Sequence, residues 1–513
     1  MSYVLGLDVG TGGARAIIVD EAGTVVAEAT SEYPLYTPRP LWAEQDPAEW
    51  WQATQAAIGE AIHRAAIRPD QLRAAGLTGQ MHGAVFLDAD DEVLRPAMLW
   101  CDQRTQAECD WITEQVGLTR LMQIACNPAL PGFQAPKIIW VRDHSPEVYE
   151  RIRCVLLPKD YVRFLLTGEK ATEVSDASGT LLLDVPQREW SAELLATLGI
   201  DREWLPTVHE APVVSGHVTA EAAELTGLPA GLPVVGGAGD QAAAGVGNGI
   251  VGPGPVSATV GSSGVVFAYQ DKPEYDEAGR VHTFCHAVPG AWHVMGVTQG
   301  AGLSLRWCRD ELGDQERAVA AHTGHDPYDL LIAEASRAPA GSEGLIYLPY
   351  LMGERTPHLD ATARAVWFGL TGRHTRSHLL RAVLEGVTYS LRDCLQLLVG
   401  MGVRPSTVRA SGGGARSTFW RQLQADIYGL PVETLAVSEG TSYGAALLAG
   451  VGAAWWSSVP EACQATIKPV ATHEPDSDNH AIYDRFHTVY QDLYPALQGQ
   501  FARVTQLADE DVG

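Results

Sequence analysis

VVGGAGDQAAAGVGNG, residues 234–249, holds a single charged residue, Asp240, among residues with almost no side chains. An apolar strand is expected over 232–235, and the glycines after it permit a tight turn and a close approach of a ligand to the backbone. The alanines at 242–244 then begin a helix. A carboxylate at the mouth of such a strand–turn–helix unit is well placed to accept a proton from a hydroxyl. The alternative is an N-cap aspartate that only stabilises the start of the helix.

The composition limits the classes of partner. The chain has 513 residues, enough for roughly two to four domains. Its 36 basic and 62 acidic side chains give a net charge of −26. We therefore expect no nucleic-acid and no membrane partner, because both polyanions would be repelled.

The cysteines and the first residues favour a cytoplasmic protein. The chain has eight cysteines, without a CxxC pair or a metal-ligand spacing, so we expect reduced thiols. The opening residues, MSYVLGLDVG, lack the basic and apolar blocks of a secretory signal.

The N-terminal segment predicts a β-meander with strands over 3–8, 14–19 and 24–29. Its first turn, DVGTGG, brings the carboxylate of Asp8, the hydroxyl of Thr11 and exposed amides together. Glycines let the amides converge on a phosphate, while Asp8 faces the metal ion that such a phosphate carries. The alternative is an ordinary glycine-rich hairpin.

A strand over 74–78 ends in Gly-Gln-Met-His-Gly. The pair Met81 and His82 suits recognition of a hydroxyl group, because a neutral imidazole can donate and accept at once. A histidine with a purely structural role is the alternative. Trp100, after the next strand, offers an aromatic plate for a sugar, or it is a core tryptophan beside a surface ion pair.

The pattern of the N-terminal turn returns in the second half. Strands are expected over 256–260 and 265–269, and the turn between them reads Gly261-Ser262-Ser263-Gly264. Two such hairpins facing each other would hold a triphosphate from both sides. Chance similarity between two short glycine turns is the alternative.

A strand over 407–411 is followed by three glycines, 412–414, and by a helix expected over 418–428. Bare backbone before a helix N-terminus lets a flat ring and a ribose lie against it, so we expect the nucleoside here. The alternative is a plain strand–helix connection.

Other periodic segments predict the scaffold. A helix opened by Asp46 should reach about Ala66. The segment 174–184 reads as a turn followed by a strand, with no side chain to which we assign chemistry. The tail over 482–507 should form a helix pair interrupted at Pro495. Further helices are expected over 133–142, 158–167, 376–399 and 439–448.

The chain resembles the FGGY family of carbohydrate kinases over nearly its full length. The order and number of the motifs make this resemblance specific, whereas glycine turns alone do not. Met81-His82-Gly83 favours, within the family, the members that act on D-xylulose over those that act on glycerol. The motifs include DVGTGGARA, GQMHGA, LWCDQR, APKIIW, LLPKDY, GAGDQAAAGVG, TVGSSG, LPYLMGERTPH and ASGGGARS.

The resemblance implies an α/β fold with two ribonuclease-H-like domains of the actin and hexokinase superfamily and a cleft between them. Residues 1–245 would form the N-terminal domain, with the sugar site and the catalytic base. Residues 246–513 would form the C-terminal, ATP-binding domain. The oligomeric state stays open, with a homodimer as a candidate assembly.

The resemblance also assigns roles to residues. Asp240 matches the catalytic base, Met81 and His82 match the sugar-binding pair, and Asp8 matches the acid near the metal and the phosphates. The phosphate and adenosine loops are matched by Gly261, Ser262, Ser263, Gly413 and Gly414. We complete the site with Trp100 and Gln241 for the sugar and with Thr11 and Gly12 for the nucleotide.

Two positions depart from the family pattern. Gln134 stands where Pro, Ser or Thr usually precedes the signature lysine, and Ser262 follows a glycine where Thr is common. Serine keeps the hydroxyl, so neither change threatens the chemistry.

The resulting hypothesis is transfer of a phosphoryl group from ATP, with Mg²⁺, to the terminal hydroxyl of a ketopentose, giving D-xylulose 5-phosphate. Asp240 would accept the hydroxyl proton and Asp8 would orient the metal. One alternative is a kinase for another ketose or polyol, such as ribulose, rhamnulose or glycerol. The other is a non-catalytic ATP or sugar switch on the same fold.

Overall fold

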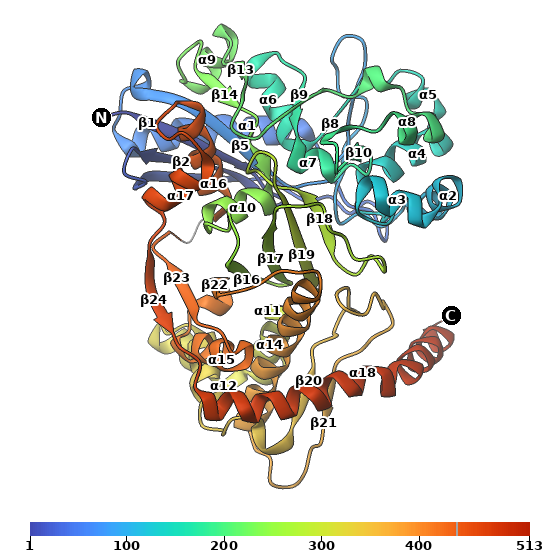
Figure 1. The fold of residues 1–513 in the computed structure, drawn as a ribbon, viewed down its shortest axis with the longest axis vertical. Coiled ribbons are helices and arrows are strands. Elements are labelled where there is room, and N and C mark those ends of the chain that lie inside the picture. Colours follow the sequence, from blue (N-terminus) through green and yellow to red (C-terminus); the bar gives the residue numbers. More distant parts are fainter. Residues whose placement is uncertain (438–439, 513) are drawn as a thin grey trace. The chain divides into compact units, whose positions relative to one another are not determined.

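The computed structural model describes residues 1–437 and 440–512, the last four of these as backbone only (Figure 1). The described residues form two compact units. Unit 1 comprises Met1–Gly252, Tyr269–His293 and Glu439–Ile467, and unit 2 comprises Pro253–Ala268, Val294–Ser438 and Lys468–Gly513. Both units combine sheets with helices, which confirms the predicted α/β class.

Unit 1 is built on a mixed sheet with the strand order β13-β14-β5-β1-β2-β3, to which β15 adds beside β5. The antiparallel pairs β1–β2 and β2–β3 confirm the predicted meander. On the other side, β5 runs parallel to β1, and β14 and β15 run parallel to β5. The strands are β1 (Tyr3–Val9), β2 (Gly13–Asp20), β3 (Val25–Glu32), β5 (Leu72–Gly79), β13 (Val214–His217), β14 (Pro233–Val235) and β15 (Ala238–Gly239).

Alternation along β1 places two helices on opposite faces of this sheet. Leu5, Leu7 and Val9 share a core cluster with residues of α1 (Pro47–Ala65). Gly6 faces the other way, against α16 (Gly440–Gly452), because successive residues of a strand point to opposite faces. α16 comes late in the chain and is drawn in orange beside β1 and β2 in Figure 1.

Glycines allow α16 to touch the sheet and α10 (Asp240–Gly247) backbone to backbone. A Cβ on Gly6 would lie 2.2 Å from the Ser442 carbonyl oxygen, and one on Gly76 2.2 Å from that of Ala445. A Cβ on Gly444 would lie 1.9 Å from the carbonyl oxygen of Ala243 in α10. α16 therefore has no room to move closer to the strands or to α10.

The second main sheet has the order β18-β19-β17-β16-β22-β23-β24. β16 pairs antiparallel with β17 and parallel with β22, and β22 runs parallel to β23. The strands are β16 (Pro255–Val260), β17 (Gly264–Gln270), β18 (His282–Cys285), β19 (Trp292–Thr298), β22 (Thr407–Gly412), β23 (Val432–Leu435) and β24 (Pro469–His473).

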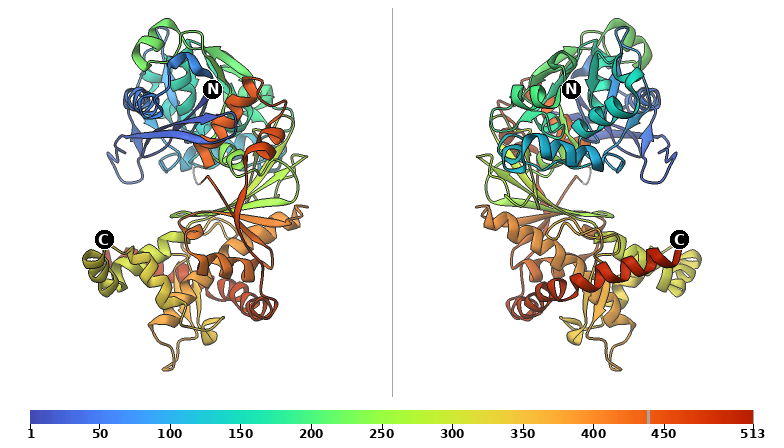
Figure 2. Two further views of the ribbon diagram at one scale, coloured as in Figure 1. Left: turned by 90° about the vertical axis from the view of Figure 1, so that its left-hand side faces the viewer. Right: turned by 90° about the vertical axis from the view of Figure 1, so that its right-hand side faces the viewer.

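Helices of unit 2 gather around α14, whose length is buried on most sides. The C-terminal helix α18 runs along this unit (Figure 2, right) and contacts α14 and α15. The helices are α11 (Ala301–Leu312), α12 (Asp314–Thr323), α13 (Pro327–Ala335), α14 (Arg376–Gly400), α15 (Thr418–Tyr428) and α18 (Ser477–Val512).

Shorter elements complete the fold. The remaining helices are α2 (Gln106–Val116), α3 (Leu118–Ala125), α4 (Gln134–His144), α5 (Pro146–Tyr149), α6 (Pro158–Thr167), α7 (Val174–Ser178), α8 (Ala192–Leu198), α9 (Ala220–Thr226) and α17 (Val459–Thr466). The remaining strands are β4 (Glu44–Gln45), β6 (Val85–Leu87), β7 (Ala97–Met98), β8 (Cys154–Leu156), β9 (Ala171–Glu173), β10 (Leu183–Asp184), β11 (Glu189–Trp190), β12 (Thr207–His209), β20 (Ile346–Leu348) and β21 (Val366–Phe368).

Most of the predicted elements are confirmed, and two predictions are wrong. The segment 174–184 begins with the helix α7 rather than a turn. The tail is one continuous helix rather than a pair, with Pro495 inside it at an exposed position. The start predicted at Glu439 lies outside the described residues, and α16 is described from Gly440.

The cysteines and the helix lengths relate to the expectations of reduced thiols and of no membrane partner. All eight cysteines lie in described segments, none forms a disulfide bond, and every one except Cys101 is buried. Among the described residues, no helix combines the length and the apolar character needed to cross a membrane.

We expect Gly76→Ala to destabilise the protein by about 1–3 kcal/mol, because the new methyl group would overlap the backbone of α16. The matched control is Gly59→Ala on α1, where an added Cβ meets no atom within 4 Å, and which should stabilise slightly. Denaturant unfolding of both variants measures the difference. Equal midpoints would contradict the close contact between α16 and β5.

Candidate functional site

The carboxyl ends of three parallel strands meet at one edge of the unit 1 sheet. In register, Asp8 of β1 lies beside Thr78 of β5, and Thr78 lies beside Ala238 of β15. The segments that leave this edge carry Asp240 after β15 and the Met81-His82 pair after β5. Ligands of open α/β sheets bind at such an edge.

Asp240 is the first residue of α10, and the N-cap of that helix is Gly239. The N-cap interpretation of Asp240 is therefore wrong. Burial, and secondly the negative charge of Asp8, raise the pKa of Asp240 to about 7. Gln241, the next residue, is half-buried, and its side chain forms a hydrogen bond with Asp240. This hydrogen bond lowers the pKa of Asp240 and so opposes the effect of burial. A carboxylate with a pKa near 7 is suited to accept a proton at neutral pH.

Asp8 is held from a distant part of the chain. The hydroxyl of Thr441, in the first turn of α16, donates to Oδ2 of Asp8 at 2.7 Å. Sequence reasoning missed Thr441, because 433 residues separate the partners and only the packing of α16 on β1 brings them together.

The donor set at Asp8 suits a metal ion that is bound mainly by other groups. Among the described residues, no group of three or more His, Cys, Asp or Glu is arranged to hold a metal ion. A single hard carboxylate oxygen fits Mg²⁺, which commonly takes one or two protein carboxylates and completes its shell with phosphates and water.

Polar side chains shape the turn after β1. The hydroxyl of Thr11 accepts from Trp100 Nε1 at 3.0 Å and donates to Gln80 Oε1 at 3.2 Å. The amide of Gln45 donates to the Thr11 carbonyl at 2.7 Å, and that of Gln80 donates to Gln45 Oε1 at 2.9 Å. Gly12 takes part through its carbonyl, which accepts from the backbone N–H of Tyr33. The turn is therefore more than a plain hairpin, and the two buried glutamines were not predicted.

Met81 and His82 lie next to the segment before Asp240. Added Cβ atoms on Gly239 and Gly179 would each lie about 3.0–3.1 Å from atoms of the Met81 side chain. His82 adopts a left-handed φ of 70°, and its Nδ1 is 2.7 Å from the carbonyl oxygen of Gly179. The Met81-His82 pair and Asp240 thus belong to one compact group in unit 1.

Lys137 fixes the unusual backbone at His82. Its Nζ donates to the His82 carbonyl at 2.9 Å and also to the carbonyl of Gly132. Burial lowers the pKa of Lys137 to about 7, and an amine in either protonation state keeps at least two hydrogens for these two carbonyls. The signature lysine is therefore a backbone anchor in this structure.

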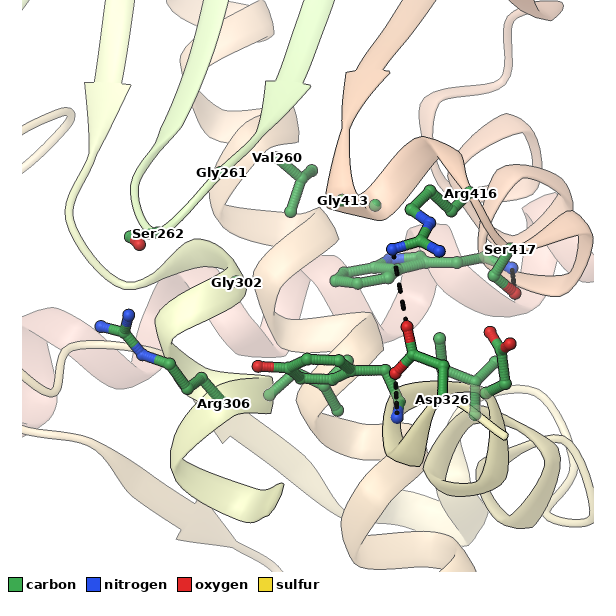
Figure 3. Close-up of a pocket in the computed structure, with 15 residues that line it drawn as sticks. Val260, Gly261, Ser262, Gly302, Arg306, Asp326, Gly413, Arg416 and Ser417 are labelled. Atoms are coloured by element: carbon green, nitrogen blue, oxygen red, sulfur yellow. Dashed lines mark hydrogen bonds and ion pairs between the residues drawn. The ribbon is translucent and has the colours of Figure 1, made fainter. Parts of the chain in front are cut away.

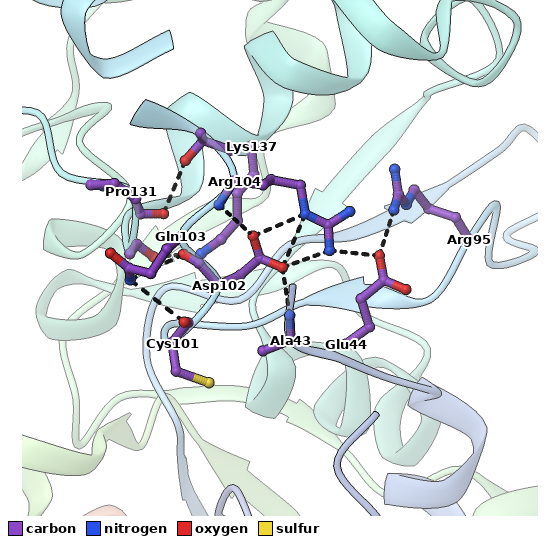
Figure 4. A network of polar contacts seen from close by, with 11 residues as sticks. Ala43, Glu44, Arg95, Cys101, Asp102, Gln103, Arg104, Pro131 and Lys137 are labelled. Atoms are coloured by element: carbon purple, nitrogen blue, oxygen red, sulfur yellow. Dashed lines mark hydrogen bonds and ion pairs between the residues drawn. The ribbon is translucent and has the colours of Figure 1, made fainter. Parts of the chain in front are cut away.

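Trp100 is 39% exposed, so it is not a core tryptophan. The ion pair beside it is not on the surface either, because the side chains of Asp102 and Arg104 are 0% and 2% exposed. Figure 4 shows Asp102 accepting from Arg104 and from the backbone N–H of Ala43, with Glu44 on the far side of the guanidinium. Both parts of the structural alternative for Trp100 are wrong, and the ring stays available to a ligand.

Unit 2 contains a pocket of about 240 Å³ at the carboxyl ends of β16 and β22. The predicted Gly261, Ser262, Gly413 and Gly414 all line it, whereas Ser263 is not among its lining residues. Figure 3 shows these loops on one side and the start of α13 on the other. The remaining lining residues are Val260, Gly302, Leu305, Arg306, Asp326, Tyr328, Asp329, Ile332, Arg416, Ser417 and Trp420.

Close backbone contacts fix the loop at one side of this pocket. The N–H groups of Gly302 and Leu303 donate to the carbonyls of Gly261 and Ser262 at 2.8 and 3.0 Å. A Cβ on Gly302 would lie 2.3 Å from the carbonyl oxygen of Gly261. The loop amides are thereby presented by a rigid backbone.

Sequence reasoning missed the wall of this pocket that α13 provides. Asp326 caps α13 by accepting from Tyr328 N, and its carboxylate lies 3.5 Å from the guanidinium of Arg416. The capping pattern was readable from Asp-Pro at 326–327, but nothing in it pointed to a ligand. The strand–helix connection at 412–417 is therefore part of a concave site.

Comparisons with known proteins decide the family. Residues 3–247 match the N-terminal domain of the FGGY family of carbohydrate kinases, and residues 256–453 match its C-terminal domain. The chain belongs to the FGGY family of carbohydrate kinases. A sugar and ATP are accordingly the substrates of this phosphotransferase.

Similar FGGY kinases cover almost the whole chain. A xylulose kinase of Escherichia coli strain K12 is 40% identical over 502 residues, which are 96% of this chain and 99% of the relative. A xylulose kinase of Bacillus subtilis strain 168 is 37% identical over 494 residues, 96% of this chain and 97% of the relative. A crystal structure of a "xyloylose kinase" from Brucella ovis has a TM-score of 0.88 at 39% identity, covering 97% of this chain and 99% of its own.

The structure places the predicted site residues in two groups. Asp8, Thr11, Gly12, Met81, His82, Trp100, Asp240 and Gln241 lie in unit 1, and Gly261, Ser262, Ser263, Gly413 and Gly414 lie in unit 2. The roles of these residues, the domain boundaries at 245 and 246, and the cleft in which both hairpins hold one triphosphate stay predictions.

We expect Asp240→Asn to raise the Tm at pH 8 by roughly 2 °C or more. The folded-state pKa of about 7 exceeds the value of about 3.9 in an unfolded chain. Between these values the unfolded state binds fewer protons, so this carboxyl lowers the stability as the pH rises towards 7. The gain in Tm should therefore shrink by pH 5.

Differential scanning calorimetry at both pH values measures this effect. The control is Asp90→Asn, at an exposed carboxylate in a turn far along the sequence, which should change the Tm little at either pH. A Tm of Asp240→Asn at or below that of the wild type at pH 8 would contradict the claim that the ionised Asp240 lowers the stability of the folded protein.

Proposed function

We propose that this enzyme phosphorylates D-xylulose with ATP, giving D-xylulose 5-phosphate and ADP. The observation that carries the proposal is the place of Asp240, at the edge of the unit 1 sheet beside Asp8 and the Met81-His82 pair, with a pKa near 7. Similarity to xylulose kinases over nearly the whole chain supports the choice of sugar.

On the sugar side, Asp240 accepts the proton of the terminal hydroxyl as its oxygen attacks the γ-phosphorus. The new oxygen–phosphorus bond forms as the bond between the γ-phosphorus and the bridging oxygen breaks, and ADP leaves. His82 and the exposed ring of Trp100 orient the ketose, while Met81 supplies an apolar contact. A positioned base of this kind contributes about 10²–10⁴-fold to the rate.

On the nucleotide side, the pocket of unit 2 takes the adenosine. Its apolar surfaces from Leu305, Ile332 and Trp420 suit a flat ring, and the glycines at 413 and 414 let the ring and ribose approach the backbone. The amides of the Gly261 turn, and those at Thr11 and Gly12, bind phosphate oxygens.

Mg²⁺ bound with ATP neutralises charge on the phosphates, and Asp8 is the residue that would hold it. Thr441 keeps the Asp8 carboxylate in place for this role through its hydrogen bond. We further infer a cytoplasmic location, which the free thiols support. The homodimer stays a prediction.

The decisive experiment compares wild type and Asp240→Asn in a coupled assay with D-xylulose, ribulose, rhamnulose and glycerol. We expect D-xylulose to give the highest kcat/KM, and Asp240→Asn to lower kcat by at least ~10²-fold while D-xylulose still binds in calorimetry. The exposed control Asp90→Asn should keep the wild-type rate.

Each outcome decides between the alternatives. Equal kcat/KM values on several sugars would overturn a dedicated xylulose kinase, and xylulose binding without any product would favour a switch. A wild-type rate in Asp240→Asn would overturn the role of the base.

We expect Ile332→Trp to weaken ATP binding by tenfold or more without changing the Kd for D-xylulose. Ile332 lines the pocket and is 8% exposed, so the larger ring would occupy space that the adenosine needs. The control is Val319→Trp on the exposed side of α12. Calorimetric titration with ATP measures both variants, and an unchanged affinity would place the nucleotide elsewhere.

A further inference from the structure

The short helix α7 contacts both ends of the proposed sugar site, although sequence analysis assigned it no chemistry. The hydroxyl of Ser175 accepts a hydrogen bond of 3.1 Å from the backbone N–H of Gly239. Gly239 is the residue directly before Asp240 and the N-cap of α10. We propose that Ser175 is a positioning residue for Asp240, fixing the backbone from which the general base projects.

This hydrogen bond acts at a point with little other freedom. Gly239 ends β15, and its partner in the sheet is Gly79 at the end of β5. Its N–H is bound by the Ser175 side chain, which is fully buried. Met81 packs against the Cα of Gly239, where a Cβ would lie 3.0 Å from Met81 Cγ. Ser175 and Met81 therefore hold the residue before Asp240 by a polar and an apolar contact.

A buried network of charges anchors Ser175 itself. Glu173 caps α7 by accepting from the N–H groups of Ser175 and Asp176 at 2.7 and 2.9 Å. Lys159 Nζ lies 3.4 Å from Glu173 Oε1 and 3.1 Å from Asp176 Oδ2, and all three side chains are fully buried. Breaking such a network is costly, because it leaves an uncompensated charge in the interior.

The anchor is tied to the same strand that carries the sugar-binding pair. Lys159 packs under Gly79, where an added Cβ would lie 3.2 Å from Lys159 Cβ. Gly79 is followed by Gln80 and then by Met81. The network therefore fixes the distance between α7 and the end of β5.

The other end of α7 holds the proposed sugar-binding histidine. The carbonyl of Gly179, directly after α7, is 2.7 Å from His82 Nδ1. An added Cβ on Gly179 would lie 2.6 Å from the same nitrogen, so a side chain at this position would displace His82. Ser175 and Gly179 are four residues apart, and this single helical turn links the group that takes the proton to a group that binds the sugar.

The reaction needs this link, because transfer depends on the separation between the attacking oxygen and the base. A misplacement of about 1 Å can cost about 10²-fold in rate. Without the hydroxyl of Ser175, the N–H of Gly239 loses its partner, and the backbone before Asp240 is held only by its pairing with Gly79 and its contact with Met81. This inference rests on the proposed role of Asp240 as the general base.

The test compares Ser175→Ala with Ser178→Ala. Ser178 lies in the same helix, is 1% exposed, and its Oγ accepts from the backbone N–H of Cys285 at 3.1 Å. Each variant removes one hydroxyl that accepts from a buried N–H, and Ser178→Ala also removes the hydrogen bond that Ser178 donates to the Val174 carbonyl, so Ser178→Ala should lose at least as much stability as Ser175→Ala. Only Ser175→Ala removes the bond to the residue before Asp240.

We expect Ser175→Ala to lower the single-turnover rate constant by about 10- to 100-fold, with the KM for ATP unchanged. Ser178→Ala should lower the same rate constant less than threefold. Rapid-quench measurement separates phosphoryl transfer from product release, and calorimetric melting shows that each variant is folded. Equal rate constants in the two variants would overturn the proposal.

Two further variants keep the result decisive. Ser175→Cys keeps the shape of the side chain with a somewhat larger sulfur that is only a weak acceptor, so it fills the site and should show a similar loss even where Ser175→Ala does not fold. Asp240→Asn, measured alongside, separates the two proposals. If it is inactive while both Ser175 variants keep the wild-type rate, only the positioning role fails, and if it keeps the wild-type rate, the proposed base fails.

Discussion

The burial of the Asp240 carboxyl group close to the charge of Asp8 is the constraint at the edge of the unit 1 sheet. Burial, and secondly the charge of Asp8, make ionisation of Asp240 unfavourable and bring its pKa to about 7. Such a pair lowers stability, so it persists only where the surrounding structure over-determines both positions. The register of β1, β5 and β15 fixes the backbone around both residues. The hydroxyl of Thr441 holds the carboxylate of Asp8, and the hydroxyl of Ser175 holds Gly239, the residue before Asp240.

The precision of this arrangement comes from contacts between backbones. Carbonyl oxygens of α16 lie against Gly6 of β1 and Gly76 of β5, where a side chain would otherwise be. In the same way, a carbonyl oxygen of α10 lies against Gly444 of α16. A flexible side chain can relax when its neighbour moves, whereas two backbones in contact cannot. Thr441, in the first turn of α16, therefore reaches Asp8 from a fixed position.

Local patterns in the sequence predicted the strands, the longer helices and the place of Asp240, because apolar alternation and glycine turns act over a few residues. Contacts between distant segments were beyond such patterns. Thr441 looks like an ordinary helix start, and Ser175 sits in a helix too short to show periodicity. The continuous helix through Pro495 also escaped prediction, because a proline inside a helical pattern usually ends or kinks the helix. The cleft between the domains and the residue roles remain predictions.

The two units repeat one strand pattern with different side chains at equivalent positions. β1 pairs antiparallel with β2 and parallel with β5, as β16 does with β17 and β22. In unit 1, Asp8 of β1 lies beside Thr78 of β5, one residue before the last pair of the two strands. In unit 2, Thr259 of β16 lies beside Ser411 of β22, also one residue before the last pair. Where unit 1 has a carboxylate, unit 2 has a hydroxyl pair joined at 2.7 Å. A neutral pair at this position does not repel phosphate, whereas a carboxylate there needs a cation between itself and the phosphates. Under the proposed function, a carboxylate in place of a hydroxyl at this register position would distinguish the proton and metal site of unit 1 from the nucleotide site of unit 2.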